Sequence, residues 1–173
     1  MATETIEDVF QQPFTFTARP RSIPCDLRLV WRLHSLVLLL DACRGQKASH
    51  QQLHVLNWAS RNEESRRSFI DFLNGNRTPN QIIVRYDPSL NRAVHFAFAE
   101  GLIERQTAQD SDRDTEPTVP PYRILLTEKG RALLAQTHDM DDCFTTLKQF
   151  LTGLPGKIGQ KQIELLFSWE ISS

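Results

Sequence analysis

The sequence has little of several features that would indicate a class of function. Its 173 residues include 3 cysteines and 7 glycines, and 20 basic side chains nearly balance 21 acidic ones. Cys25, Cys43 and Cys143 are too few and too widely spaced for a disulfide framework, which favours a reducing compartment. The scattered glycines form no phosphate-binding loop. A formal net charge of -1 provides no general attraction to nucleic acid or membrane.

Long apolar runs are also missing. The longest, at residues 36–40, is far shorter than the about 20 residues that span a bilayer. The acidic N-terminus contains no apolar stretch of signal-peptide length. Hydrophobic residues still make up 40% of the chain, and about 70% of the unfolded surface can be buried at this length. We therefore expect a cytoplasmic, soluble protein with its own hydrophobic core and no membrane contact.

Side chains that carry catalysis or bind metals form no recognisable constellation. His50 and His54 lie four residues apart in one predicted helix, but no cysteine pair or carboxylate completes a metal shell. The sequence has no HExxH motif, no Gly-x-Ser-x-Gly elbow and no local Cys–His pair. We therefore predict no catalytic, metal-binding or cofactor-binding residues and no cofactor. A small enzyme is the third and weakest functional hypothesis.

Apolar periodicity and turn residues predict a mainly helical chain. Helices are expected, in chain order, from Asp26 to about Cys43, after the capping residue Ser49, around 69–73, over 89–100, over 131–135, around 144–154 and within 158–171. Short β stretches are expected at 82–86, 102–105 and 122–126. Gly45 suits the left-handed position after the first helix. The acidic run at 139–142 is expected to cap the helix around 144–154.

The order of these elements is the most informative result. Residues 93–134 resemble the second half of a winged-helix domain. In a winged-helix domain, as predicted for this segment, a recognition-type helix ends at a glycine, here Gly101, and two strands enclose a wing. A Leu-Thr-x-x-Gly turn, here 126–130, then begins the next helix. The predicted fold class is therefore mainly α with a small β-wing.

Three regions are expected along the chain. Residues 1–24, with three prolines and no helical period, form an extended N-terminal arm. Residues 25–136 form a winged-helix-like domain with an inserted helix and an acidic wing at 106–121. Residues 137–173 form a C-terminal helical extension.

The predicted recognition helix and wing are poorly suited to DNA, which basic and amide side chains normally contact. The helix over 89–100 offers Asn91, Arg92 and His95 as polar readers. The wing carries four acidic residues and one arginine, and its negative charge would repel phosphate. The wing is therefore either a solvated loop or a surface for a basic partner.

Arginines outside the wing could still form a local positive patch. The candidate contacts to a DNA backbone are Arg66, Arg67, Arg85 and Arg92. In the alternative interpretation, these and neighbouring arginines form ion pairs with nearby acidic side chains on a solvent-exposed face. The acids available for such pairs are Glu63, Glu64, Asp71 and Asp87.

Apolar side chains near the two ends of the chain are candidates for contacts with a partner protein. The candidate partner-binding residues are Phe10, Phe14, Ile163, Leu166, Phe167 and Trp169. Buried aromatic anchors are typical of interface hot spots. The alternative, at both ends, is packing on the chain's own core.

Three segments carry a resemblance to a known family. They are 28–61, with a long apolar helix and a later Trp-Ala; 82–104, with Val-Arg-Tyr-Asp-Pro-Ser-Leu leading into a helix; and 127–134, with Thr-Glu-Lys-Gly-Arg-Ala-Leu-Leu. Together they resemble the middle components of bacterial three-component ABC-ATPase systems. These include the small accessory subunit of Lamassu-type antiphage defence. The resemblance extends over residues 28–170.

The resemblance implies a non-enzymatic bridging subunit in an antiphage or anti-plasmid complex. Its partners would be an SMC- or Rad50-like ATPase and an effector nuclease, and DNA contact would occur through the complex. The family offers no catalytic residues to transfer to this chain. The alternative function is a winged-helix transcription regulator, which would bind duplex DNA in a salt-sensitive way that depends on Arg92.

Overall fold

The computed structural model describes residues 24, 28–78, 82–107, 122–140 and 143–167. These residues form seven α-helices and one three-stranded antiparallel sheet, which confirms the predicted mainly helical class with a small sheet. The helices are α2 (Leu29–Ala42), α3 (His50–Ser60), α4 (Glu63–Leu73), α5 (Pro88–Ala99), α6 (Glu128–Asp139), α7 (Thr145–Thr152) and α8 (Gln160–Phe167). A short 3-10 turn, η2 (Arg44–Gln46), follows α2, and the strands are β1 (Lys47–Ala48), β2 (Ile103–Thr107) and β3 (Tyr122–Leu126).

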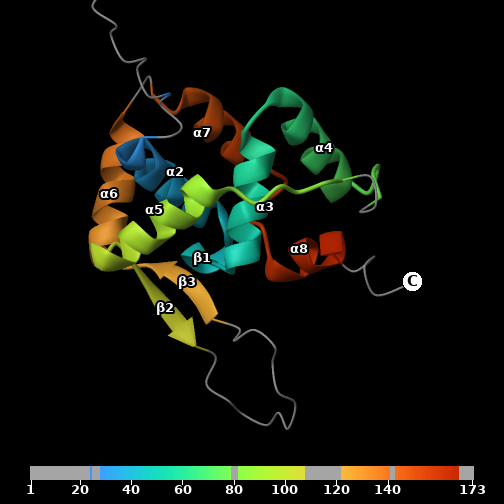
Figure 1. Ribbon diagram of the computed structural model, residues 1–173. Helices are drawn as coiled ribbons and strands as arrows, with labels where there is room; N and C mark the ends of the chain where they lie inside the picture. Colours follow the sequence, from blue (N-terminus) through green and yellow to red (C-terminus); the bar gives the residue numbers. More distant parts are fainter. Residues whose placement is uncertain (1–23, 25–27, 79–81, 108–121, 141–142, 168–173) are drawn as a thin grey trace, which may run out of the picture.

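Helix α2 is the centre of the fold and is surrounded by other helices (Figure 1). It packs against α3, α5, α6 and α7. Its side chains Leu36, Leu39 and Leu40 are fully buried, and burial of one such leucine stabilises a protein by about 1.5–3 kcal/mol. The helix is therefore apolar around most of its circumference, as its sequence predicts.

Polar side chains fix where four of the helices begin. Ser49, Asn62, Asp87 and Thr127 each accept a hydrogen bond from a backbone N–H in the first turn of α3, α4, α5 and α6, respectively. Ser49 forms a full capping box, because the side chain of Gln52 also accepts from the Ser49 backbone N–H. Each cap is worth about 1 kcal/mol. The predicted cap Ser49 is confirmed, and of the two residues that the sequence offers as a cap for α5, Asp87 and Ser89, it is Asp87 that caps the helix.

The sheet has the strand order β1-β3-β2, and both strand pairs are antiparallel. Ile103 lies opposite Leu126 and Thr107 opposite Tyr122, so the two predicted strands flanking the wing are confirmed. Figure 1 shows this hairpin projecting from the helical body. The sequence analysis missed β1, which has only two residues. The wing residues 108–121 lie outside the described part of the chain.

The turn between β3 and α6 gives the Leu-Thr-x-x-Gly pattern a physical meaning. The hydroxyl of Thr127 accepts the N–H of Gly130 at 3.1 Å and lies 3.0 Å from the Leu102 carbonyl oxygen, to which it donates. Gly130 packs so closely that an added Cβ would lie 2.1 Å from the same carbonyl oxygen. Only glycine fits at this contact. The motif therefore holds α6 against the beginning of β2.

The predicted β stretch at 82–86 is wrong, because these residues belong to no strand. The β-branched residues Ile82, Ile83 and Val84 favour a strand locally, but in the fold Ile82 is buried and Ile83 is 77% exposed. The segment after residue 81 instead crosses α3 on its way to α5 (Figure 1).

The predicted acidic cap of the helix around 144–154 is also wrong for the described residues. Asp139 is the last residue of α6. Helix α7 begins after Phe144, and its first turn contains no acidic residue. Asp141 and Asp142 lie outside the described residues.

The C-terminal part of the described chain is attached to the body through Ile158. Its backbone N–H donates to the Ala42 carbonyl at 3.1 Å, and its carbonyl accepts from the Arg44 N–H at 3.2 Å. The same carbonyl accepts from the side chain of Gln52 at 2.8 Å. Helix α8 then packs on α3. None of the described helices combines the length and apolar character needed to cross a bilayer.

Candidate functional site

The most elaborate polar arrangement surrounds Asp87, which caps α5. One carboxylate oxygen, Oδ1, accepts from the backbone N–H of Ser89 at 2.9 Å and from its hydroxyl at 2.7 Å. The other, Oδ2, lies 2.9 Å from Nη2 of Arg32 and 2.7 Å from Nη2 of Arg61. One carboxylate thus joins the beginning of α5 to α2 and to the residue that follows α3.

Asn57 of α3 completes this cluster. Arg32 donates to the side-chain oxygen of Asn57 at 2.9 Å, and the Asn57 amide donates to Asp87 at 3.2 Å. Arg32, Asn57 and Asp87 are all buried. Burial alone would raise the pKa of Asp87, but the hydrogen bonds from Ser89 and the nearby guanidinium groups outweigh it and hold that pKa well below its usual range. Asp87 is therefore charged at neutral pH.

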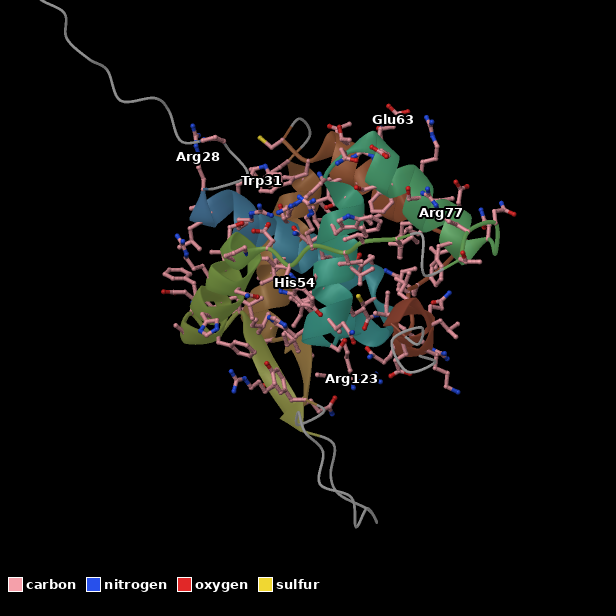
Figure 2. All side chains as sticks on the ribbon, turned by 45° about the vertical axis from the view of Figure 1, so that its right-hand side comes forward. Arg28, Trp31, His54, Glu63, Arg77 and Arg123 are labelled. Atoms are coloured by element: carbon pink, nitrogen blue, oxygen red, sulfur yellow. The ribbon has the colours of Figure 1, made fainter. Side chains whose placement is uncertain are left out.

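His54 lies beside this cluster, in the middle of the molecule (Figure 2). Its Nδ1 accepts from the backbone N–H of Asp87 at 3.2 Å, so the proton of the neutral ring is on Nε2. Nε2 then donates to the side-chain oxygen of Asn91 at 2.8 Å. Burial is the main cause that lowers the pKa of His54. The His50 ring lies 4.6 Å away, between ring centroids, but both His54 nitrogens already have partners.

No group of three or more His, Cys, Asp or Glu side chains within the described ranges is arranged to hold a metal ion. Cys43 is buried and Cys143 is exposed, and both are free thiols. Burial raises the pKa of Cys43 to about 12, so this thiol is protonated and a poor nucleophile at neutral pH.

The outward face of α5 borders a groove of about 650 Å³. Phe96 on α5 and Leu29 on α2 both line it, and both are more than a third exposed. Arg92 and His95 border the same groove. Arg32 lies at its base, buried and paired with Asp87. The exposed face of the predicted recognition helix is therefore partly apolar.

The three polar side chains predicted to contact DNA from this helix are not equally accessible. Arg92 and His95 are exposed. Asn91 is only partly exposed, and its side-chain oxygen is bonded to His54. The Asn91 side chain therefore supports the fold as well as bordering the groove.

The four candidate DNA-backbone arginines lie on different parts of the structure. Arg66 lines a groove beside α7, Arg67 lines one beside α4, and Arg92 lines the α5 groove. Arg85 is exposed on the segment before α5. Arg67 pairs with Glu63 at 2.6 Å, as the alternative interpretation predicts. The arginines thus do not gather in one of these grooves.

The structure describes only some of the residues predicted to contact a partner protein. Ile163 and Leu166 are buried in this chain's own core, as the alternative of packing on the chain itself predicts. The side chains of Phe167 and Trp169 lie outside the described residues, as do Phe10 and Phe14. The exposed apolar residue on α8 is Leu165, which the sequence analysis did not select.

Sequence analysis also missed the structural role of Arg32. This residue is buried and bonded to Asn57 and Asp87. A signal was present, because Arg32 interrupts an otherwise apolar helical stripe between Trp31 and Leu33. A charge on such a stripe requires a buried partner of opposite sign. The partner is 55 residues away in sequence, so no local pattern identifies it.

Comparison of the chain with protein-family models, with curated proteins and with solved structures gave no match, so its function has to be inferred from its own residues.

Proposed function

We propose that this chain is a non-enzymatic accessory subunit of an antiphage or anti-plasmid defence complex. In this proposal it links an SMC- or Rad50-like ATPase to an effector nuclease, and any DNA contact occurs through the complex. The sequence resemblance over 28–170 suggests the class of complex. The nature of the α5 surface supports a protein-binding role.

The order of the elements supports a winged-helix-like body. Helix α2, strand β1 and helix α3 come first, and α5, β2, β3 and α6 follow. The antiparallel order β1-β3-β2 places the hairpin at one edge of the sheet, as in a winged helix. In this interpretation α4 is the inserted helix and α5 occupies the place of the recognition helix.

The exposed apolar groove beside α5 is the observation that carries the proposal. A DNA-reading helix presents basic and amide side chains to the major groove. Here Phe96 and Leu29 are exposed in the groove, next to Arg92 and His95. Exposed aromatic and aliphatic side chains beside an arginine are typical of protein–protein interfaces. This face therefore suits a subunit contact better than a DNA contact.

The base of the hairpin supports the same conclusion. The Arg105 guanidinium lies 4.8 Å from the centre of the Phe98 ring and 4.9 Å from that of Tyr122. These aromatic contacts hold Arg105 against β3 and α5. Lys129 bonds to the carbonyl oxygen of Glu100 at 2.7 Å. Arg105 and Lys129 thus both have partners within the chain.

In the proposed mechanism the α5 groove docks on the ATPase, and the ends of the chain contact the effector. ATP and DNA would change the ATPase conformation and thereby the free energy of this interface. A weaker interface would release or activate the effector. The chain itself supplies binding energy and no chemical step.

Co-purification tests the proposal directly. The chain is co-expressed with its genomic neighbours, and the tagged protein is purified at moderate salt. Stable elution with an SMC- or Rad50-like ATPase is the expected result. Elution of the chain alone, in the presence of all neighbours, would contradict the bridging function.

A second candidate, the transcription regulator, is favoured by one observation: Arg92 and His95 are exposed on α5. It requires that the isolated protein bind duplex DNA, with an affinity that falls steeply as salt increases. It also requires loss of that binding in Arg92→Ala. A gel-shift titration at two salt concentrations distinguishes it from the subunit hypothesis.

A further inference from the structure

A second groove, of about 710 Å³, lies between the beginning of α2, the end of α3 and the beginning of α7. Figure 2 shows Trp31 near this end of α2. The lining residues that matter here are Trp31, Arg32, Arg61, Arg66, Phe144 and Thr146. The groove therefore combines cationic, aromatic and hydroxyl groups.

The charge of the groove is positive. Arg32 and Arg61 share a single carboxylate, that of Asp87. Arg66 bonds to the Ser60 carbonyl at 3.0 Å and, among the described residues, to no carboxylate. No described acidic side chain lines the groove. Among the described residues that line the groove, the charged side chains are therefore all cationic, and Arg66 is available to an anion.

The guanidinium groups are also suitably shaped. An arginine presents five N–H donors in a planar fork that fits phosphate oxygens. Arg61 uses Nη2 on Asp87, and Arg66 uses Nη1 on Ser60. Each therefore keeps a second terminal nitrogen for a ligand. Charge-assisted bonds of this kind are about twice as strong as neutral ones.

The ring of Trp31, which is partly exposed, lines the groove with these cations and packs on Phe144, which is buried. The Trp31 and Phe144 rings have their centroids 5.5 Å apart with an angle of 31° between their planes. Phe144 precedes α7, and no side chain caps this helix. The first turn of α7 thus adds its partial positive charge to the groove. Aromatic rings next to arginines are the combination that stacks a nucleobase and holds its phosphate.

We propose that this groove binds a nucleotide. Its phosphate lies against Arg61 and Arg66, and its base lies against the Trp31 ring. None of these three side chains lines the α5 groove, and the site does not involve the wing. It is therefore independent of the proposed role as a bridging subunit, and either proposal can fail alone.

The test uses the full chain with AMP, ADP and ATP, each compared with inorganic phosphate. Thermal unfolding and tryptophan fluorescence are measured at millimolar ligand. At least one nucleotide is expected to raise the Tm by several degrees and to quench fluorescence, with phosphate giving a clearly smaller effect. Equal effects of phosphate and nucleotides, or no effect of any nucleotide, would overturn the proposal.

Variants locate the binding. Arg66→Ala is expected to weaken nucleotide binding about tenfold, and Arg66→Lys to restore part of it. The matched control is Arg123→Ala, which removes an exposed arginine on β3, away from the groove (Figure 2).

Trp31→Phe keeps an aromatic ring but is expected to abolish the fluorescence change, because Trp58, the other tryptophan among the described residues, does not line the groove. Unchanged affinity in Arg66→Ala, or unchanged quenching in Trp31→Phe, would show that nucleotides bind elsewhere and would overturn this site.

Discussion

Arg32 of α2 and Asp87 at the start of α5 form a buried ion pair, with 2.9 Å between Nη2 and Oδ2 and both side chains 6% exposed. The pair lies where α2, α3 and α5 meet, because Asn57 of α3 bonds to both partners. Desolvation of two charges is costly, but the hydrogen bonds around them compensate. The pair therefore makes the three-helix arrangement depend on one carboxylate.

Asp87→Ala is expected to lower the free energy of unfolding by about 3–5 kcal/mol, because Arg32 is left buried without its carboxylate. Urea denaturation at pH 7 measures this change. The matched control is Glu63→Ala, which breaks an ion pair with Arg67 whose side chains are 73% and 78% exposed. Such surface pairs contribute at most about 1 kcal/mol. Equal losses in the two variants would contradict a central role for Asp87.

His54 is expected to make stability fall as the pH drops below about 6.5, the usual pKa of histidine. Burial is the main cause that lowers its pKa in the folded protein, with smaller effects of His50 and Arg61 in the same direction and of Asn91 and Asp87 in the opposite one. The unfolded chain takes up this proton near pH 6.5. The stabilisation is therefore complete above that pH and is lost as the pH falls toward the lowered pKa.

One such proton changes the free energy of unfolding by at most about 1.4 kcal/mol per pH unit. Burial also lowers the pKa of His34, so His54→Gln should reduce the slope without abolishing it. His95→Gln replaces an exposed histidine and serves as the control. Urea denaturation at several pH values measures the slopes. An unchanged slope in His54→Gln would show that this ring does not resist protonation.

Features set by neighbouring residues were predictable from the sequence. Ser49 was predicted as a helix cap and Asp87 as one of two candidates with Ser89, and both Ser49 and Asp87 accept a backbone N–H. Gly45 was expected to be left-handed after the first helix, and its φ is 70°. The hairpin strands were also recognised. In each case the residue type and its immediate neighbours determine the conformation.

Features that depend on distant partners were not predictable. Residues 82–86 are rich in β-branched side chains, but a strand also needs a partner strand, and the sheet formed by β1, β3 and β2 does not include them. The two residues of β1 have too little sequence to show a period. Asp87 was expected to cap a helix, but its second oxygen bonds to Arg32, whose position depends on the tertiary fold. The same holds for the convergence of Arg61 and Arg66 on one groove.

Gly130→Ala is expected to destabilise the protein by more than about 2 kcal/mol. The new Cβ would lie 2.1 Å from the Leu102 carbonyl oxygen and 3.1 Å from Leu126, so α6 would have to move away from the hairpin. Gly159→Ala is the control, since its Cβ would make an ordinary contact at 3.7 Å. Thermal unfolding compares the two variants. A mild effect of Gly130→Ala would mean that α6 shifts at little cost.

Phe96→Asp is expected to reduce co-purification with the ATPase at least tenfold while leaving the fold intact. The side chain is 39% exposed, so its replacement costs little burial in the isolated chain, but a charge in the apolar groove opposes docking. Ile83→Asp is the matched control, because it places the same charge on another exposed apolar residue that does not line the groove. Thermal unfolding checks the fold of both variants. Equal losses of the ATPase would indicate a non-specific effect of charge, whereas normal recovery with Phe96→Asp would place the interface away from α5.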